Sequence, residues 1–145
     1  MKIINIKLPR LIITFIFVVA ALTVSCSLTK GKEQGEHAVE EFHRQFNSGQ
    51  YQEMYQQSDD KFREAATQEE FVQLLEAVKR KLGSVGKITQ SGWKVNATPS
   101  GTVVSLGYEV EFSDGKGVEQ FSFLISGEQT KLLRYDVNSP LLITR

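Results

Sequence analysis

The side chains that most often carry chemistry are few in this sequence. Cys26 is the only cysteine, and His37 and His43 are the only histidines among 145 residues. Six residues turn a helix through about 600°, which leaves the two histidines about 240° apart around the axis, so they would not act together. We interpret both as residues of a helix surface. Because no His or Asp/Glu cluster has ligand spacing and no phosphate-binding or dinucleotide motif occurs, the sequence predicts no catalytic residue, metal site or cofactor.

The N-terminus has the pattern of an export signal. Residues 1–10 contain three Lys or Arg side chains and no acid, and residues 11–22 form an apolar run in which Thr14 is the one polar residue. A helix that spans a membrane needs about 20 apolar residues, whereas a run of this length is typical of a signal peptide. We therefore predict that residues 1–25 are a signal peptide. An uncleaved membrane anchor is the alternative.

Cys26 directly follows this signal. It forms no disulfide within the chain, and a lone thiol is a liability in an oxidising compartment unless it is modified. Residues 22–26 (LTVSC) resemble a bacterial lipobox, although Leu stands one position earlier than is usual. The resemblance implies a signal for lipidation at Cys26, with palmitate-type acyl chains as a membrane anchor. Ordinary secretion with cleavage nearby is the alternative.

The residues after Cys26 are polar and have no periodic pattern (SLTKGKEQG, residues 27–35). We therefore expect a lipidated, flexible tether at residues 26–35, followed by one domain at residues 36–145. Lipidation implies the cell envelope as the location. If the source is Gram-negative, Ser27 in place of Asp favours the outer membrane, with the domain facing the periplasm.

The composition is that of a globular domain, with 41% hydrophobic and 23% charged residues. Lys and Arg number 17, as do Asp and Glu, and removal of residues 1–25 leaves 14 basic and 17 acidic side chains. Nucleic-acid binding normally needs a clustered basic surface. The mildly acidic balance therefore argues against nucleic acid as a partner.

The first half of the domain has helical periodicity. Apolar residues predict a helix over residues 36–46 and a shorter one from Tyr51 to about Ser58. Thr67 and Glu70 form a capping-box pattern at the start of a third helix, which Gly83 ends. In this third helix, we expect Phe71, Leu74, Leu75 and Val78 to be buried.

After Gly83 the apolar period changes to two, which predicts four strands at residues 85–97, 102–112, 118–126 and 131–138. We expect Val110 to pair with Phe121, Phe123 to pair with Tyr135, and a bulge near Ser91-Gly92. These pairings place Leu106, Tyr108, Val110, Phe121, Phe123 and Tyr135 in the core.

The same pattern predicts which polar side chains point toward the helices. Glu109, Glu111 and Asp136 are expected on the opposite face, and only Tyr108 and Tyr135 are expected to point inward. General acid-base catalysis needs a titratable group within reach of the substrate. With no inward base on the predicted sheet, a non-enzymatic role is favoured.

A set of core and turn residues has a recognisable arrangement over about residues 35–138. They are Gly49, Tyr51, Met54, Tyr55, Phe62, Thr67, Glu70, Phe71, Leu75, Leu82, Gly83, Tyr135, Asp136 and Val137. This arrangement resembles the nuclear transport factor 2-like (cystatin-like) superfamily. The resemblance implies an α+β roll, in which three N-terminal helices pack on a curved four-stranded antiparallel sheet. An α+β fold of another topology is the alternative.

Two functions follow from these expectations. The first is a membrane-anchored, non-catalytic module that binds an envelope partner or a small apolar ligand. The alternative is a small cone-type enzyme, similar to isomerases, dehydratases or hydrolases of that superfamily. A set of aromatic residues would either fill the core or line an apolar pocket. The set consists of Trp93, Tyr108, Phe112, Phe121, Phe123 and Tyr135.

Overall fold

A computed structural model describes the backbone of residues 10–143 and the side chains of residues 29–143. The chain divides into two compact units, residues 1–30 and residues 31–145. Within the described residues, no helix is long and apolar enough to cross a membrane. The predicted lipidation site, Cys26, lies in a helical stretch of backbone, and its side chain is outside the described residues.

The chain forms helices first and a sheet second, which confirms the α+β class. Three helices were expected before the sheet, whereas residues 10–84 form four, because Phe62 lies in a short helix of its own. The elements are α1 (Arg10–Ser48), α2 (Tyr51–Gln56), α3 (Asp60–Ala65), α4 (Gln68–Leu82), β1 (Val85–Thr98), β2 (Gly101–Phe112), β3 (Lys116–Ser126), β4 (Gln129–Asn138) and α5 (Pro140–Ile143).

Helix α4 begins and ends where the sequence predicts. Thr67 Oγ1 accepts from the backbone N–H of Glu70, and Glu70 Oε2 accepts from the backbone N–H of Thr67 (2.8 Å), which completes the capping box. Gly83 ends the helix with a φ of 83°, a conformation that favours glycine. The prediction of a buried Leu74 is wrong, since its side chain is 39% exposed.

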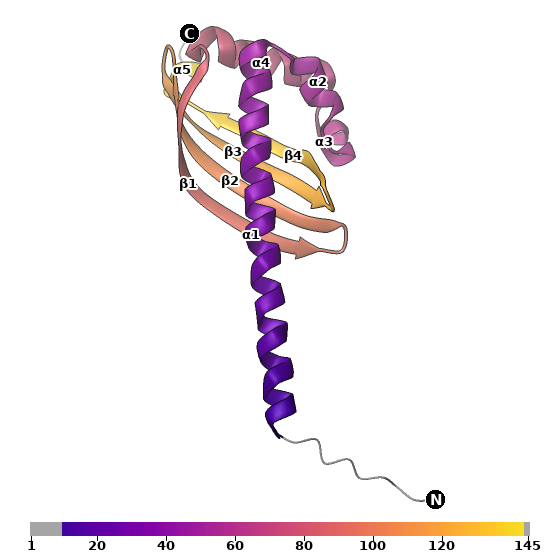
Figure 1. Cartoon of the computed structure of the whole chain (residues 1–145). Coiled ribbons are helices and arrows are strands. Elements are labelled where there is room, and N and C mark those ends of the chain that lie inside the picture. Colours follow the sequence, from indigo (N-terminus) through magenta and orange to yellow (C-terminus); the bar gives the residue numbers. More distant parts are fainter. Residues whose placement is uncertain (1–9, 144–145) are drawn as a thin grey trace, which may run out of the picture. The chain divides into compact units, whose positions relative to one another are not determined.

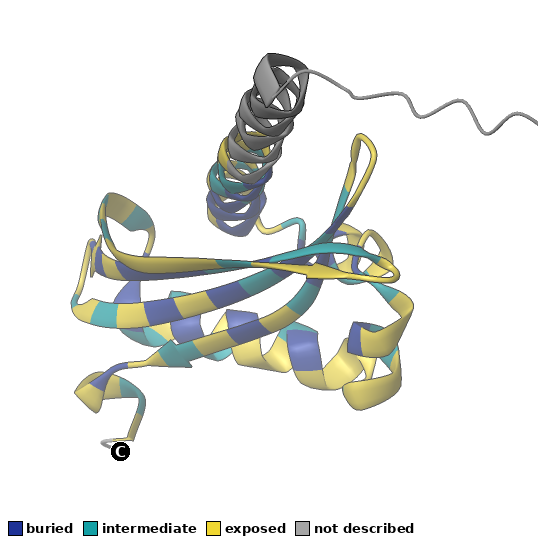
Figure 2. Cartoon of the chain, turned by 90° about the horizontal axis from the view of Figure 1, so that it is seen from below, coloured by how far each residue is buried: buried dark blue, intermediate teal, exposed yellow. Residues whose placement is uncertain are grey.

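The four strands form an antiparallel meander in the order β1-β2-β3-β4. Residues 31–48 of α1 cross one face of this sheet, which we call the inner face (Figure 1). The opposite face is called the outer face. Buried and exposed residues alternate along the strands (Figure 2), because successive side chains point to opposite faces.

The faces of β2 and β3 agree with the predicted pattern, but the predicted pairings are wrong. In β4, a register shift places Leu132, rather than Leu133, opposite Phe123. Leu106, rather than Val110, pairs with Phe121, and Phe121, rather than Phe123, pairs with Tyr135. The turn after Phe112 is shorter than predicted, so the observed β2–β3 register differs from the predicted one by two residues on each strand. Because side chains alternate with a period of two, this shift leaves each of them on the same face. The expected bulge in β1 is confirmed by a register shift between Gln90 and Gly92, and a second shift lies between residues 85 and 88.

Helix α1 extends further toward the N-terminus than predicted. Residues 29–35, expected to be flexible, are helical, and Gly31 and Gly35 are buried. A Cβ atom on Gly35 would lie 3.0 Å from Val104 Cγ1 and 3.1 Å from Leu106 Cδ1. The lack of a side chain on Gly35 therefore lets α1 approach β2 closely.

This packing predicts opposite roles for the two glycines. Gly31→Ala should raise the free energy of unfolding by about 0.5–1 kcal/mol, because alanine favours a helix and its Cβ meets only ordinary contacts, the nearest at 3.6 Å. Gly35→Ala should not raise the free energy of unfolding in this way, because the added Cβ atom would crowd Val104 and Leu106 of β2. Urea denaturation of both variants measures the difference. Equal effects would contradict the close packing of Gly35.

Candidate functional site

A carboxylate, an imidazole and a phenol meet in the interior of the domain. Glu119 of β3 lies on the inner face, and its side chain is 2% exposed. Its Oε2 atom lies 2.6 Å from Nε2 of His43 on α1, and its Oε1 atom accepts a hydrogen bond from the Tyr135 hydroxyl on β4 (2.7 Å). His43 and Tyr135 are also buried. We call these three residues the inner polar cluster.

The surroundings of the inner polar cluster are aromatic. The rings of Phe42 and Tyr135 lie 4.7 Å apart, and Phe121 contacts the Phe42 ring edge-on at 5.0 Å and the His43 ring at 5.7 Å. Polar groups in such a setting are stable only when they are hydrogen-bonded. Each carboxylate oxygen of Glu119 has a partner within the domain, so the cluster is internally satisfied.

Two interpretations of the sequence are therefore wrong. His43 is not a surface residue, and the sheet does carry an inward acid. Glu119 stands two positions before Phe121, so the strand period alone places it on the inner face. Applying the alternation that identified Phe121 and Phe123 to Glu119 would have found this acid. Glu109, Glu111 and Asp136 are exposed, as expected.

The cluster makes a prediction for alkaline solution. Burial raises the pKa of Tyr135 well above its ordinary value, and the nearby Glu119 adds to the increase. The folded-state pKa of the Tyr135 hydroxyl is therefore higher than its unfolded-state pKa. The stability that the protonated hydroxyl contributes is complete below about pH 10 and decreases as pH rises beyond it. Between pH 9 and pH 11, the free energy of unfolding should therefore decrease less for Tyr135→Phe than for the wild type. Urea denaturation at each pH measures it. Parallel curves would contradict the prediction.

The predicted aromatic set divides into buried and exposed members. Trp93 is 55% exposed, and the ammonium group of Lys32 lies 5.8 Å from the centre of its ring. Of the inward tyrosines, Tyr108 accepts a hydrogen bond from Gln90 Nε2 (3.2 Å). The buried members are Tyr108, Phe112, Phe121, Phe123 and Tyr135.

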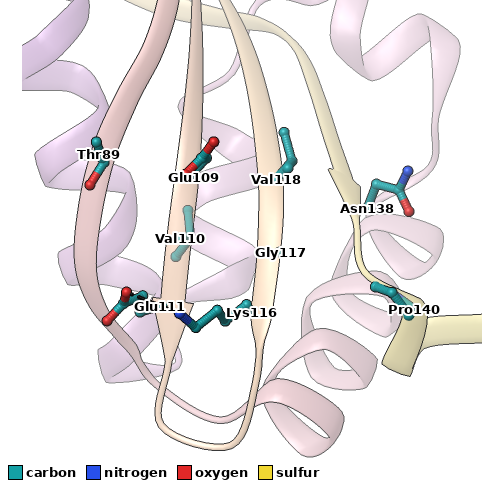
Figure 3. Close-up of a pocket in the computed structure, with 9 residues that line it drawn as sticks. All are labelled: Thr89, Glu109, Val110, Glu111, Lys116, Gly117, Val118, Asn138 and Pro140. Carbon is teal, nitrogen blue, oxygen red and sulfur yellow. Dashed lines mark hydrogen bonds and ion pairs between the residues drawn. The ribbon is translucent and has the colours of Figure 1, made fainter.

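The outer face carries a hollow of about 430 Å³ near the start of β3. Thr89, Glu109 and Val118 pair across three strands and stand side by side over it (Figure 3). An ion pair between Lys116 and Glu111 (3.3 Å) borders the hollow, and the end of β4 closes another side. Charged and apolar side chains both line the hollow, among them Glu109, Lys116 and Val118.

Two further hollows, of about 300 and 430 Å³, lie across the middle of the outer face. Ser105 and Gln120 line both of them, so the hollows are neighbours. Gly92 and Gly107 pair with each other beneath the first, and an Arg134–Asp136 ion pair borders the second. The outer face is therefore recessed, polar and exposed.

The described part of the chain contains no group of three or more His, Cys, Asp or Glu side chains arranged to hold a metal ion. In comparisons with known proteins, residues 34–135 match the model of a family described as "Protein of unknown function (DUF4019)". No curated protein matches the sequence.

Proposed function

The chain belongs to the DUF4019 family, and we propose that it is a lipid-anchored protein of the bacterial cell envelope whose domain binds a partner without catalysis. The observation that supports binding is the contrast between the two faces of the sheet. The inner face is covered by α1 and packed core side chains, whereas the hollows described above and exposed polar groups lie on the outer face.

We favour a protein partner over a small apolar ligand. Five of the six aromatic residues that would line an apolar pocket are buried in the core, and none of these five borders the three hollows of the outer face. The outer face offers hydroxyl, amide, carboxylate and guanidinium groups, which are typical of the polar part of a protein interface.

Site-specific crosslinking tests this role of the outer face. A photoreactive residue at Gln120 should give discrete crosslinked products in intact cells, because Gln120 lies between two of the hollows. The same residue at Gln73, exposed on α4, is the control and should give none. Mass spectrometry of the purified protein should find no retained small molecule. Equal yields from both positions, or a retained apolar compound, would count against a protein partner on this face.

Anchoring is the second part of the proposal. Its support is the basic start, the apolar run at residues 11–22 and the lone Cys26 after small residues. Three acyl chains, as the lipobox resemblance implies, exceed the two signals that stable membrane attachment requires. We expect Cys26→Ala to lose fatty-acid labelling and to leave the membrane fraction, with Ser27→Ala as the control. A membrane-bound, unlabelled Cys26→Ala protein would contradict lipidation.

We also propose that the domain is a nuclear transport factor 2-like roll. The support is the order of helices before a four-stranded antiparallel meander, with α1 on its inner face. Superposition of an experimental structure on members of that superfamily tests the assignment.

The inner polar cluster favours one alternative, a cone-type enzyme. A buried carboxylate beside an imidazole and a phenol is a combination suited to proton transfer. Both oxygens of Glu119 are already occupied by His43 and Tyr135, so we rank catalysis second. Turnover of a small substrate that is lost in a folded Glu119→Gln variant, with crosslinking from Gln120 absent, would reverse this order.

A further inference from the structure

The packed part of α1 starts beside two strand turns. A Cβ on Gly31 would lie 3.6 Å from Thr102 Cγ2, immediately after the β1–β2 turn. Gln34 Nε2 donates a hydrogen bond to the carbonyl of Gly127 (3.2 Å), in the β3–β4 turn. Both turns therefore lie at the end of the domain where the chain enters it. We call residues 98–101 and 126–129 the entry turns.

The length of chain before this point limits where the domain can lie. Four residues, 27–30, separate Cys26 from Gly31. Five Cα-to-Cα steps cover at most about 18 Å when extended and about 8 Å when helical. An anchor at Cys26 would therefore hold the entry turns close to the lipid surface, whatever path these residues take.

The other end of α1 is much further away. Ser48 lies 17 residues after Gly31 in the same helix, which corresponds to about 26 Å along the axis. Figure 1 shows this end of α1 near α4 and away from the β1–β2 and β3–β4 turns. The domain thus has a near end and a far end with respect to its point of attachment.

From these observations we propose that the entry turns face the phospholipid headgroups and that the Ser48 end points into the aqueous compartment. The proposal rests on the anchoring at Cys26 and adds an orientation to it. The side chains of the entry turns suit a headgroup layer, because they are polar or small, with Glu128 as the charged member and no large apolar group to enter the hydrocarbon. They are Thr98, Pro99, Ser100, Gly101, Ser126, Gly127, Glu128 and Gln129.

The solitary cysteine makes this orientation measurable. In the mature, lipidated protein the Cys26 thiol is consumed, so Ser100→Cys and Ser48→Cys each supply one thiol for a fluorophore. Both serines are exposed. The labelled proteins are reconstituted into phosphatidylcholine vesicles that carry a short-range quencher on a headgroup. We expect quenching at residue 100 to exceed quenching at residue 48 by about twofold or more, given the separation along α1.

Two controls separate orientation from anchoring. Quenching by a soluble iodide ion in the absence of vesicles should be similar for the two labels, because both positions are exposed. Co-flotation of the protein with the vesicles reports attachment independently. Attached protein with equal or reversed quenching would overturn the orientation and leave the anchoring intact. Failure to float would overturn the anchoring, and the orientation with it.

Discussion

Glu119→Ala is expected to lower the free energy of unfolding by about 3–5 kcal/mol. Glu119 is buried and joins α1 to two strands through His43 and Tyr135. Its removal leaves a buried imidazole and a buried hydroxyl without their acceptor, and breaking a buried pair in this way has a large cost. Urea denaturation followed by circular dichroism measures the loss.

Glu109→Ala is the matched control for this experiment. Glu109 belongs to the adjacent strand β2, but its side chain is exposed on the outer face. Its replacement should leave the denaturation midpoint unchanged within error. The double variant His43→Ala/Glu119→Ala should lose less stability than the two single losses added together, because the residues share one interaction. Strict additivity would show that the inner polar cluster contributes no coupling.

Phe123→Ala should also cost about 3–5 kcal/mol, through loss of buried surface and creation of a cavity. Phe123 is 3% exposed, and its ring stacks on Phe121 with the centres 5.9 Å apart and an angle of 7° between the planes. It pairs with Val104 on one side and Leu132 on the other. The measurement is again the free energy of unfolding in urea.

Trp93→Ala provides the comparison for Phe123. Trp93 pairs with Leu106 on the same inner row as Phe121, but it belongs to β1 at the edge of the sheet and remains more than half exposed. We expect a much smaller loss of stability for Trp93→Ala than for Phe123→Ala, although tryptophan is the larger residue.

A loss under about 1 kcal/mol for Phe123→Ala would mean that the inner face is assigned incorrectly.

The apolar periodicity predicted the faces of the strands but left the register undetermined. A shift of two residues on each strand keeps Leu106, Val110 and Phe121 on the inner face, so alternation does not distinguish the two registers. The position of the β2–β3 turn decides between the two registers. The backbone N–H groups of Ser113 and Asp114 donate to the carbonyls of Ser84 and Leu82 (both 2.9 Å). These contacts involve the end of α4, which a pattern within the strands does not reveal.

Tertiary packing also explains the missed helical segment and the missed acid. Gly31 and Gly35 favour flexibility in isolation, but their lack of side chains permits contact with β2. Glutamate is a residue type that is normally exposed, and the partner of Glu119, His43, is 76 residues away in sequence. In both places the stabilising contact comes from a distant element, so residue type alone suggests the wrong environment.

The two register shifts in β1 have a consequence for aggregation. β1 is at one edge of the sheet, and a regular edge strand can join to the edge of another molecule through its unpaired backbone groups. The shifts interrupt the regular spacing of those groups at two places, and the exposed Lys87 and Lys94 add charges that repel a second copy. Such an edge discourages intermolecular β-sheet formation between copies of the chain that meet at high concentration.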